Sequence, residues 1–298
     1  MVGLLLGSRD IYGGMNYVQE LDHMDDAGEM GKLLEKEKKR FAGSEIAGKT
    51  LGVVGLGAIG SIIANLGLEL GMDVIGYDPA ISVEAAWRLS GRVARMENLQ
   101  ALLAKADFVT LHVPAIPATK DLINSETLAL MKSSAKILNF AREQIVNTEA
   151  MVAALDKGVI AGYISDFPVP ELLGRKDVLL MPHIGASTAE AEENCAVMAA
   201  NQLMDFIENG NIKNSVNFPS TKMARNGGTR LTFCNSNVPK VLGNVLSILA
   251  DFELNVVDMV NKSRNEVAYN IIDVEGELSD EIVDQIQQVD GVMRIRVI

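Results

Sequence analysis

The fold of this chain is decided by residues 50–60, which read TLGVVGLGAIG. The short apolar run 50–54 predicts a buried parallel strand. A helix is predicted from about Ala58 to Leu70, and a second strand over 73–77 ends at Asp78. A glycine turn between strand and helix, with an acid about 20 residues further on, is typical of a dinucleotide-binding βαβ unit.

Each position in this turn has a physical reason. Gly55 permits the tight turn, Gly57 lets the backbone approach a pyrophosphate, and Gly60 lets the helix pack closely on the strand. The helix N-terminus offers free N–H groups to phosphates. The predicted phosphate-binding residues are Gly55, Gly57, Ala58, Ile59 and Gly60.

Asp78 favours NAD over NADP, because a carboxylate accepts hydrogen bonds from both ribose hydroxyls and repels a 2′-phosphate. Two alternatives stay open. FAD or a nucleotide sugar can use the same loop, and a tight turn with a surface carboxylate also occurs in α/β domains that bind no nucleotide.

Strands and helices continue to alternate along the chain, which predicts a doubly wound parallel sheet of the Rossmann type. Ser125 is the expected N-cap of one of these helices. Further strands are expected at 108–113, 135–139, 160–166 and 178–181, and helices at 99–105, 125–131, 148–157 and 189–208.

The last 70 or so residues have the βαββαβ order of a ferredoxin-like fold. The expected elements are a strand at 230–234, a helix at 239–252, two strands within 255–275, a helix at 279–289 and a strand at 293–298. The expected domains are a helical segment 1–47, a nucleotide-binding domain 48–186, a return helix 187–209, a linker 210–228 and a C-terminal domain 229–298.

The amino-acid composition limits the classes of partner that we expect for this protein. A net charge of −12 disfavours nucleic acid and anionic membranes. No apolar run is long enough to span a bilayer, and two cysteines give no disulfide framework. We expect a cytoplasmic protein with a small-molecule substrate and no metal.

Two residues are candidates for chemistry, because each directly follows a predicted strand, where open α/β sheets bind ligands. His183 is suited to move protons near neutral pH. Arg142 can hold a carboxylate through two parallel hydrogen bonds. From spacing alone, each is equally acceptable as a capping or surface residue.

Four segments together resemble the D-isomer-specific 2-hydroxyacid dehydrogenases. They are residues 51–60, His112-Val113-Pro114 with Thr119, residues 139–142, and residues 182–188. The resemblance implies that His183 is the acid/base, that Arg142 binds the substrate carboxylate and that an acid partners His183. It also implies that His112, Pro114, Thr119 and Ala141 line the cofactor groove, with Gly185 and Ala186 beside the nicotinamide; His112 can also be read as a plain strand-end residue.

Residues 164–171 depart from the family pattern. The family places an acid three residues after the phenylalanine, where this chain has Pro170, and Glu171 follows one position later. Asp166 is displaced by one in the same way. We assign Glu171 to His183 and Asp166 to the nicotinamide amide, with the swapped assignment as the alternative.

The tail resembles the ACT regulatory domain, and the whole arrangement resembles family members that oxidise 3-phosphoglycerate. That resemblance implies a homodimer or homotetramer and an L-serine effector held by Asn237 and Asn255, although Lys240 replaces the usual glycine. The alternative for the tail is a dimerisation module.

Family members also carry most of a substrate domain before the residue that matches Met1, so an NAD-binding scaffold without turnover stays an alternative function. Another is a glyoxylate or hydroxypyruvate reductase.

Overall fold

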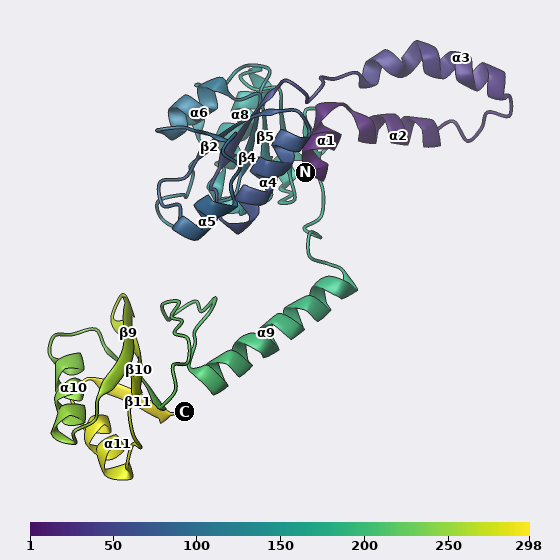
Figure 1. Ribbon diagram of the computed structural model, residues 1–298. Helices are drawn as coiled ribbons and strands as arrows, with labels where there is room; N and C mark the ends of the chain where they lie inside the picture. Colours follow the sequence, from purple (N-terminus) through teal and green to yellow (C-terminus); the bar gives the residue numbers. More distant parts are fainter. The chain divides into compact units, whose positions relative to one another are not determined.

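The computed structural model describes residues 1–298, which divide into two compact units, Met1–Ile184 and Gly185–Ile298 (Figure 1). Each unit has its own sheet. None of the helices combines the length and apolar character that crossing a lipid bilayer requires.

The first unit is built on a seven-stranded parallel sheet of order β3-β2-β1-β4-β5-β6-β7, which confirms the predicted fold class. The order reverses between β1 and β4, and ligands of open α/β sheets bind at such a switch point. The strands are β1 (Thr50–Val54), β2 (Asp73–Tyr77), β3 (Ala94–Arg95), β4 (Phe108–Leu111), β5 (Lys136–Asn139), β6 (Gly162–Ser165) and β7 (Val178–Leu180).

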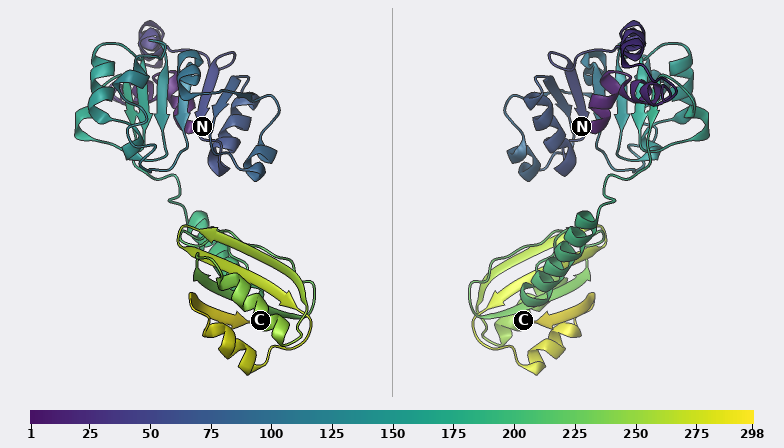
Figure 2. Two further views of the ribbon diagram at one scale, coloured as in Figure 1. Left: turned by 90° about the vertical axis from the view of Figure 1, so that its left-hand side faces the viewer. Right: turned by 90° about the vertical axis from the view of Figure 1, so that its right-hand side faces the viewer.

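Helices cover both faces of this sheet (Figure 2). Leu4 of α1 and Ala64 of α4 pack on one face, and Leu102 of α6, Leu128 of α7 and Met151 of α8 pack on the other. The helices are α1 (Val2–Ser8), α4 (Ala58–Glu69), α5 (Val83–Arg88), α6 (Leu99–Lys105), α7 (Ser125–Leu128) and α8 (Thr148–Asp156), with the 3-10 turns η2 (Glu143–Ile145) and η3 (Pro170–Leu172).

Several local details differ from the prediction. The N-cap of α7 is Asn124, whose side chain accepts from two backbone N–H groups, so Ser125 is already helical. The helix α5 and the two-residue strand β3 were not predicted. The strand predicted over 160–166 is confined to 162–165.

The first 41 residues form helices, as expected. After α1 come α2 (Ile11–Gln19), α3 (Ala27–Glu37) and η1 (Lys38–Phe41). Only α1 joins the core, where Leu4 is buried and Lys136 Nζ donates to Gly7 O at 2.6 Å. No residue of α2 or α3 is buried.

The second unit holds an antiparallel sheet of order β11-β8-β10-β9, which confirms the ferredoxin-like prediction. Its elements are α9 (Ala189–Asn209), β8 (Thr229–Ser236), α10 (Val241–Asp251), β9 (Val256–Arg264), β10 (Val267–Val274), α11 (Asp280–Gln287) and β11 (Val292–Val297). Helices α10 and α11 cover one face, and residues 206–223 supply side chains that pack on the other.

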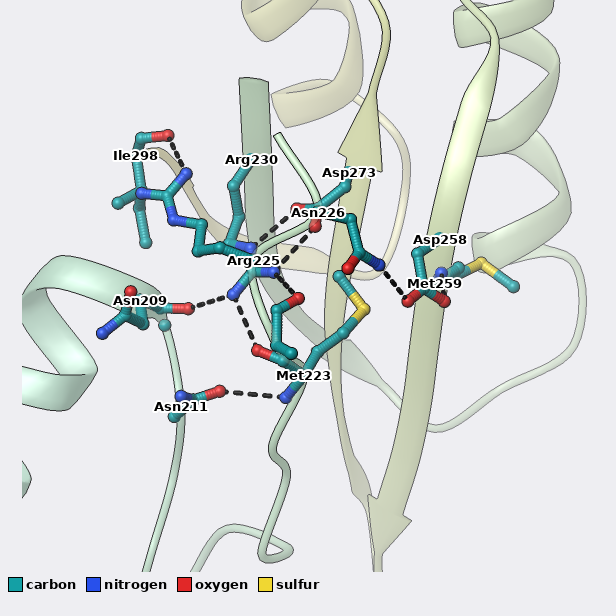
Figure 3. A network of polar contacts seen from close by, with 12 residues as sticks. Asn209, Asn211, Met223, Arg225, Asn226, Arg230, Asp258, Met259, Asp273 and Ile298 are labelled. Atoms are coloured by element: carbon teal, nitrogen blue, oxygen red, sulfur yellow. Dashed lines mark hydrogen bonds and ion pairs between the residues drawn. The ribbon is translucent and has the colours of Figure 1, made fainter. Parts of the chain in front are cut away.

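A buried ion pair ties residues 209–224 to this sheet (Figure 3). Arg230 and Asp273 are 0% and 1% exposed and share two hydrogen bonds of 2.6 and 2.7 Å. The remaining guanidinium protons go to the carbonyls of Asn209, Met223 and Ala224. A buried pair whose other hydrogen-bonding groups are satisfied fixes geometry, and breaking it on one side is costly.

Candidate functional site

The glycine turn after β1 is held by close backbone contacts. Gly55 has φ +89°, and a Cβ there would lie 2.5 Å from His112 O. A Cβ at Gly60 would lie 1.9 Å from Gly55 O. These two positions therefore require glycine for the fold of the turn itself.

Gly57 is different, because a Cβ there would meet no atom within 4 Å. Gly57 is the N-cap of α4, and no side chain caps that helix. Gly57, Ala58 and Ile59 are exposed, so the first N–H groups of α4 face open space. An uncapped helix N-terminus beside a glycine with free space in front of it fits a pyrophosphate.

Asp78 follows β2 and braces the same turn. Its Oδ2 accepts from Leu56 N at 2.8 Å, and its Oδ1 accepts from Ala80 N at 2.9 Å. Each carboxylate oxygen keeps a second lone pair for a ribose hydroxyl. The side chain is half-buried and lies directly after β2, as the sequence predicted.

His112 lies beneath the turn at the end of β4. Its backbone N donates to Val54 O at 2.7 Å, and its Nε2 lies 3.0 Å from Thr110 Oγ1. Burial lowers the pKa of His112 to about 4, with a smaller contribution from the positive N-terminus. The ring is therefore neutral at pH 7 and supports the turn from below.

Pro114 and Thr119 belong to one exposed loop after β4. Thr119 Oγ1 donates to Pro114 O at 2.5 Å and accepts from Ile116 N at 3.0 Å, so it closes this loop on itself. Ala141 lies after β5, where its N–H donates to Asn139 Oδ1 at 3.2 Å. All of these positions lie at the carboxyl edge of the sheet, the edge that holds the glycine turn.

The same edge carries His183 and Asp166, which follow the neighbouring strands β7 and β6. His183 Nδ1 lies 3.9 Å from Asp166 Oδ2, and the two side chains are 57% and 8% exposed. The ring of Phe167 packs edge-on against the imidazole, 5.1 Å between centroids. Because Nδ1 faces the carboxylate, Nε2 is the ring nitrogen left for a ligand.

Asp166 has a second property that points to a ligand. Its Oδ1 is buried and has no hydrogen-bond partner. A buried carboxylate oxygen without a donor costs free energy, so such an atom marks a position where a donor from a ligand is missing.

Glu171 lies in η3, is exposed and forms no ion pair with His183. The geometry therefore favours Asp166 over Glu171 as the carboxylate beside His183. Spacing along the chain did not decide between them, because both carboxylates follow β6 within six residues.

Arg142 is exposed in the loop after β5, the neighbour of β6. Its only side-chain hydrogen bond is from Nη1 to Ala141 O at 2.6 Å, so most of its donors are free. Asn139, fully buried, braces this loop by donating to Arg142 O at 2.9 Å and accepting from Ala141 N. Arg142, Asp166 and His183 thus follow three consecutive strands of the sheet.

The remaining candidates lie in the second unit. Gly185 and Ala186 are exposed and begin it. Asn237 follows β8 and donates to Asn265 O, and Asn255 precedes β9 and donates to Glu275 Oε2, both at 3.0 Å. Both β8 and β9 run antiparallel to β10, so the two asparagines lie at opposite ends of one sheet. One copy of the chain does not bring them together.

Comparisons with known proteins identify the family of this chain. Residues 13–185 match the model of the D-isomer-specific 2-hydroxyacid dehydrogenase NAD-binding domain. D-3-phosphoglycerate dehydrogenase of Haemophilus influenzae is 34% identical over 273 residues, covering 88% of this chain and 65% of that protein. The protein of that name from a Synechocystis species is 42% identical over 203 residues, covering 66% of this chain and 36% of that protein.

Among solved structures, a D-2-hydroxyisocaproate dehydrogenase superposes with a TM-score of 0.60 at 27% identity, covering 71% of this chain and 65% of that one. The chain thus spans less than two thirds of the length of these relatives. The family match covers more than half of the chain and includes the glycine turn, Arg142, Asp166 and His183. The chain belongs to the D-isomer-specific 2-hydroxyacid dehydrogenases and carries their NAD-binding domain.

Proposed function

We propose that this protein catalyses the NAD-dependent oxidation of D-3-phosphoglycerate to 3-phosphohydroxypyruvate, the first step of L-serine synthesis. The observation that carries the proposal is the His183–Asp166 pair at the sheet edge that also holds the glycine turn. The names of the matched relatives support the choice of substrate.

His183 acts as the base in this proposal. Its Nε2 accepts the proton of the substrate hydroxyl, and Asp166 stabilises the imidazolium that forms. NAD, when bound, supplies the acceptor for the hydride that leaves the substrate carbon bearing this hydroxyl. Arg142 holds the substrate carboxylate through a pair of parallel hydrogen bonds and so fixes the reacting carbon relative to His183.

Asp166 serves two partners in this proposal, through different oxygens. Its Oδ2 faces His183, while its buried Oδ1 has no donor in the protein. An amide N–H of the nicotinamide carboxamide is the donor that we assign to Oδ1. The two roles that the sequence divided between Glu171 and Asp166 then fall on one carboxylate.

The test is NADH formation, followed at 340 nm, with D-3-phosphoglycerate and, in separate assays, with glycolate, D-glycerate and D-lactate as alternative substrates. We expect the highest kcat/KM with D-3-phosphoglycerate. His183→Gln should abolish turnover while NAD affinity, measured by fluorescence titration, is kept. His23→Gln is the matched control, since His23 is exposed and its polar contacts are with Glu20 O and Asp22, outside the site.

The outcomes separate the alternatives. A preference for glycolate identifies a glyoxylate reductase, and a preference for D-glycerate identifies a hydroxypyruvate reductase. Retained NAD binding with no turnover on any of these acids, in either direction, identifies an NAD-binding scaffold and contradicts the proposal. The cytoplasmic location and the homo-oligomeric state stay predictions.

We also propose that L-serine binds between two copies of the C-terminal sheet, through Asn237 of one copy and Asn255 of the other. An asparagine amide offers a donor and an acceptor, which suits an α-amino acid. The opposite ends at which these residues lie support a site shared between copies rather than one within a copy.

A further inference from the structure

A cavity of about 380 Å³ lies within the second unit, on the sheet face opposite α10 and α11. It is bounded by the C-terminal half of α9, residues 211–218 and strands β8, β10 and β11. The serine-site candidates Asn237 and Asn255 do not line it. Its size is that of a small-molecule site.

The walls of this cavity are fixed by specific contacts. Tyr269 Oη donates to Gly210 O at 2.8 Å. The Asn211 side chain donates to Asp205 Oδ1 at 2.8 Å and accepts from Met223 N at 3.0 Å, the latter drawn in Figure 3. Arg296 donates to the carbonyls of Phe206 and Ile207 at the end of α9. The cavity is therefore pre-formed, which lowers the entropy cost of binding.

The lining is mainly apolar and aromatic. Phe218 packs edge-on against Tyr269 at 6.2 Å between centroids, and the Arg296 guanidinium lies 4.8 Å from the centre of the Phe206 ring. Such a surface takes the apolar body of a ligand.

The charged residues of the lining all have one sign. Lys213, Arg294 and Arg296 line the cavity, and no aspartate or glutamate does. The Nζ of Lys213 lies 4.0 Å from Asp205 Oδ2, and the guanidinium of Arg296 donates hydrogen bonds to carbonyls at the end of α9. Arg294 forms no ion pair or side-chain hydrogen bond. In a chain of net charge −12, a cavity whose only charged lining residues are cations favours an anionic ligand.

We propose that this cavity binds a small organic carboxylate with an aromatic or branched apolar body. The carboxylate pairs with the free guanidinium of Arg294, and the body packs on Phe206, Phe218 and Tyr269. This proposal concerns the second unit alone, so its test does not depend on whether the protein has the proposed dehydrogenase activity.

Calorimetry on the full chain tests the ligand class. The probes are indole-3-acetate and 4-methylpentanoate, each with its neutral amide. We expect at least one acid to bind at least tenfold more tightly than its amide. Arg294→Gln should lower that affinity at least tenfold, and Lys222→Gln, which removes an exposed charge outside the cavity, should leave it unchanged.

Cys234 reports the location of binding, because it lines the cavity and is half-buried. In a Cys195→Ser background, the bound acid should slow alkylation of Cys234 by iodoacetamide. No binding of either acid at 1 mM, equal binding of acid and amide, or binding without protection of Cys234 would each overturn the proposal. Circular dichroism checks that each variant is folded.

Discussion

At the scale of single residues, matched amide substitutions distinguish Asp166 from Glu171. Asp166→Asn keeps the shape of the side chain but removes the charge beside His183, so we expect kcat to fall by about 10²–10⁴. Glu171→Gln should change kcat less than about threefold, because Glu171 is exposed and contacts no site residue. Steady-state kinetics on both variants checks this. The reverse ranking would restore Glu171 as the partner of His183.

His112 predicts a pH dependence of stability. Its pKa is about 4 in the folded chain, against about 6.5 unfolded, so the unfolded state binds more protons between these values. Stability is therefore fully present above pH 6.5 and declines as pH falls towards 4. We expect a loss of about 1–2 kcal/mol between pH 7 and pH 5 that is missing in His112→Asn. Urea unfolding of both proteins at the two pH values measures it, and equal losses would refute it.

Lys240 is held in the left-handed region, with φ +76°, at the N-cap of α10. This conformation is unfavourable for a residue with a Cβ and accessible to glycine. We expect Lys240→Gly to raise the unfolding free energy of the second unit by about 1 kcal/mol. Lys222→Gly, at a position with no positive φ, should bring no such gain. Urea unfolding followed by circular dichroism decides between them.

At the scale of elements, the turn between β1 and α4 separates glycines for folding from glycines for binding. Gly60→Ala should destabilise the chain by about 1–3 kcal/mol, because its Cβ would overlap Gly55 O. Gly57→Ala should leave stability within about 0.5 kcal/mol, since its Cβ meets open space. The same methyl group should weaken NAD binding at least tenfold, measured by fluorescence. Unchanged NAD affinity in Gly57→Ala would remove the pyrophosphate from this turn.

Some helices and strands could be predicted from the sequence, and others could not. The elements β1 and α4 form where the pattern predicted them, because Leu51 and Val53 of β1 and Ala64 of α4 are buried in the same core. The elements α5 and β3 gave no such pattern: α5 buries only Ala85, and both residues of β3 are exposed. The partner of His183 could not be read from spacing, since it depends on which side chain turns inward as the chain leaves β6.

At the scale of the whole molecule, the chain is two units with separate sheets, and its predicted sites differ in whether one copy suffices. The glycine turn, Arg142, Asp166 and His183 all lie in one unit of one chain. Asn237 and Asn255 do not meet within a copy, since β8 and β9 place them at opposite ends of the sheet. A serine site made of both therefore requires self-association.

That requirement gives a complementation experiment. Asn237→Ala and Asn255→Ala should each abolish serine binding alone, because every site in either homodimer lacks one amide. When the two variants are mixed and allowed to exchange subunits, random pairing makes about half of the dimers mixed, and each has one intact site and one doubly defective site. Calorimetry should then recover about a quarter of the original serine stoichiometry. The double variant Asn237→Ala/Asn255→Ala, mixed with itself, recovers none. Serine binding that persists in either single variant, or a mixture that stays silent although mass spectrometry shows exchanged subunits, would mean that these two asparagines do not share a ligand across copies.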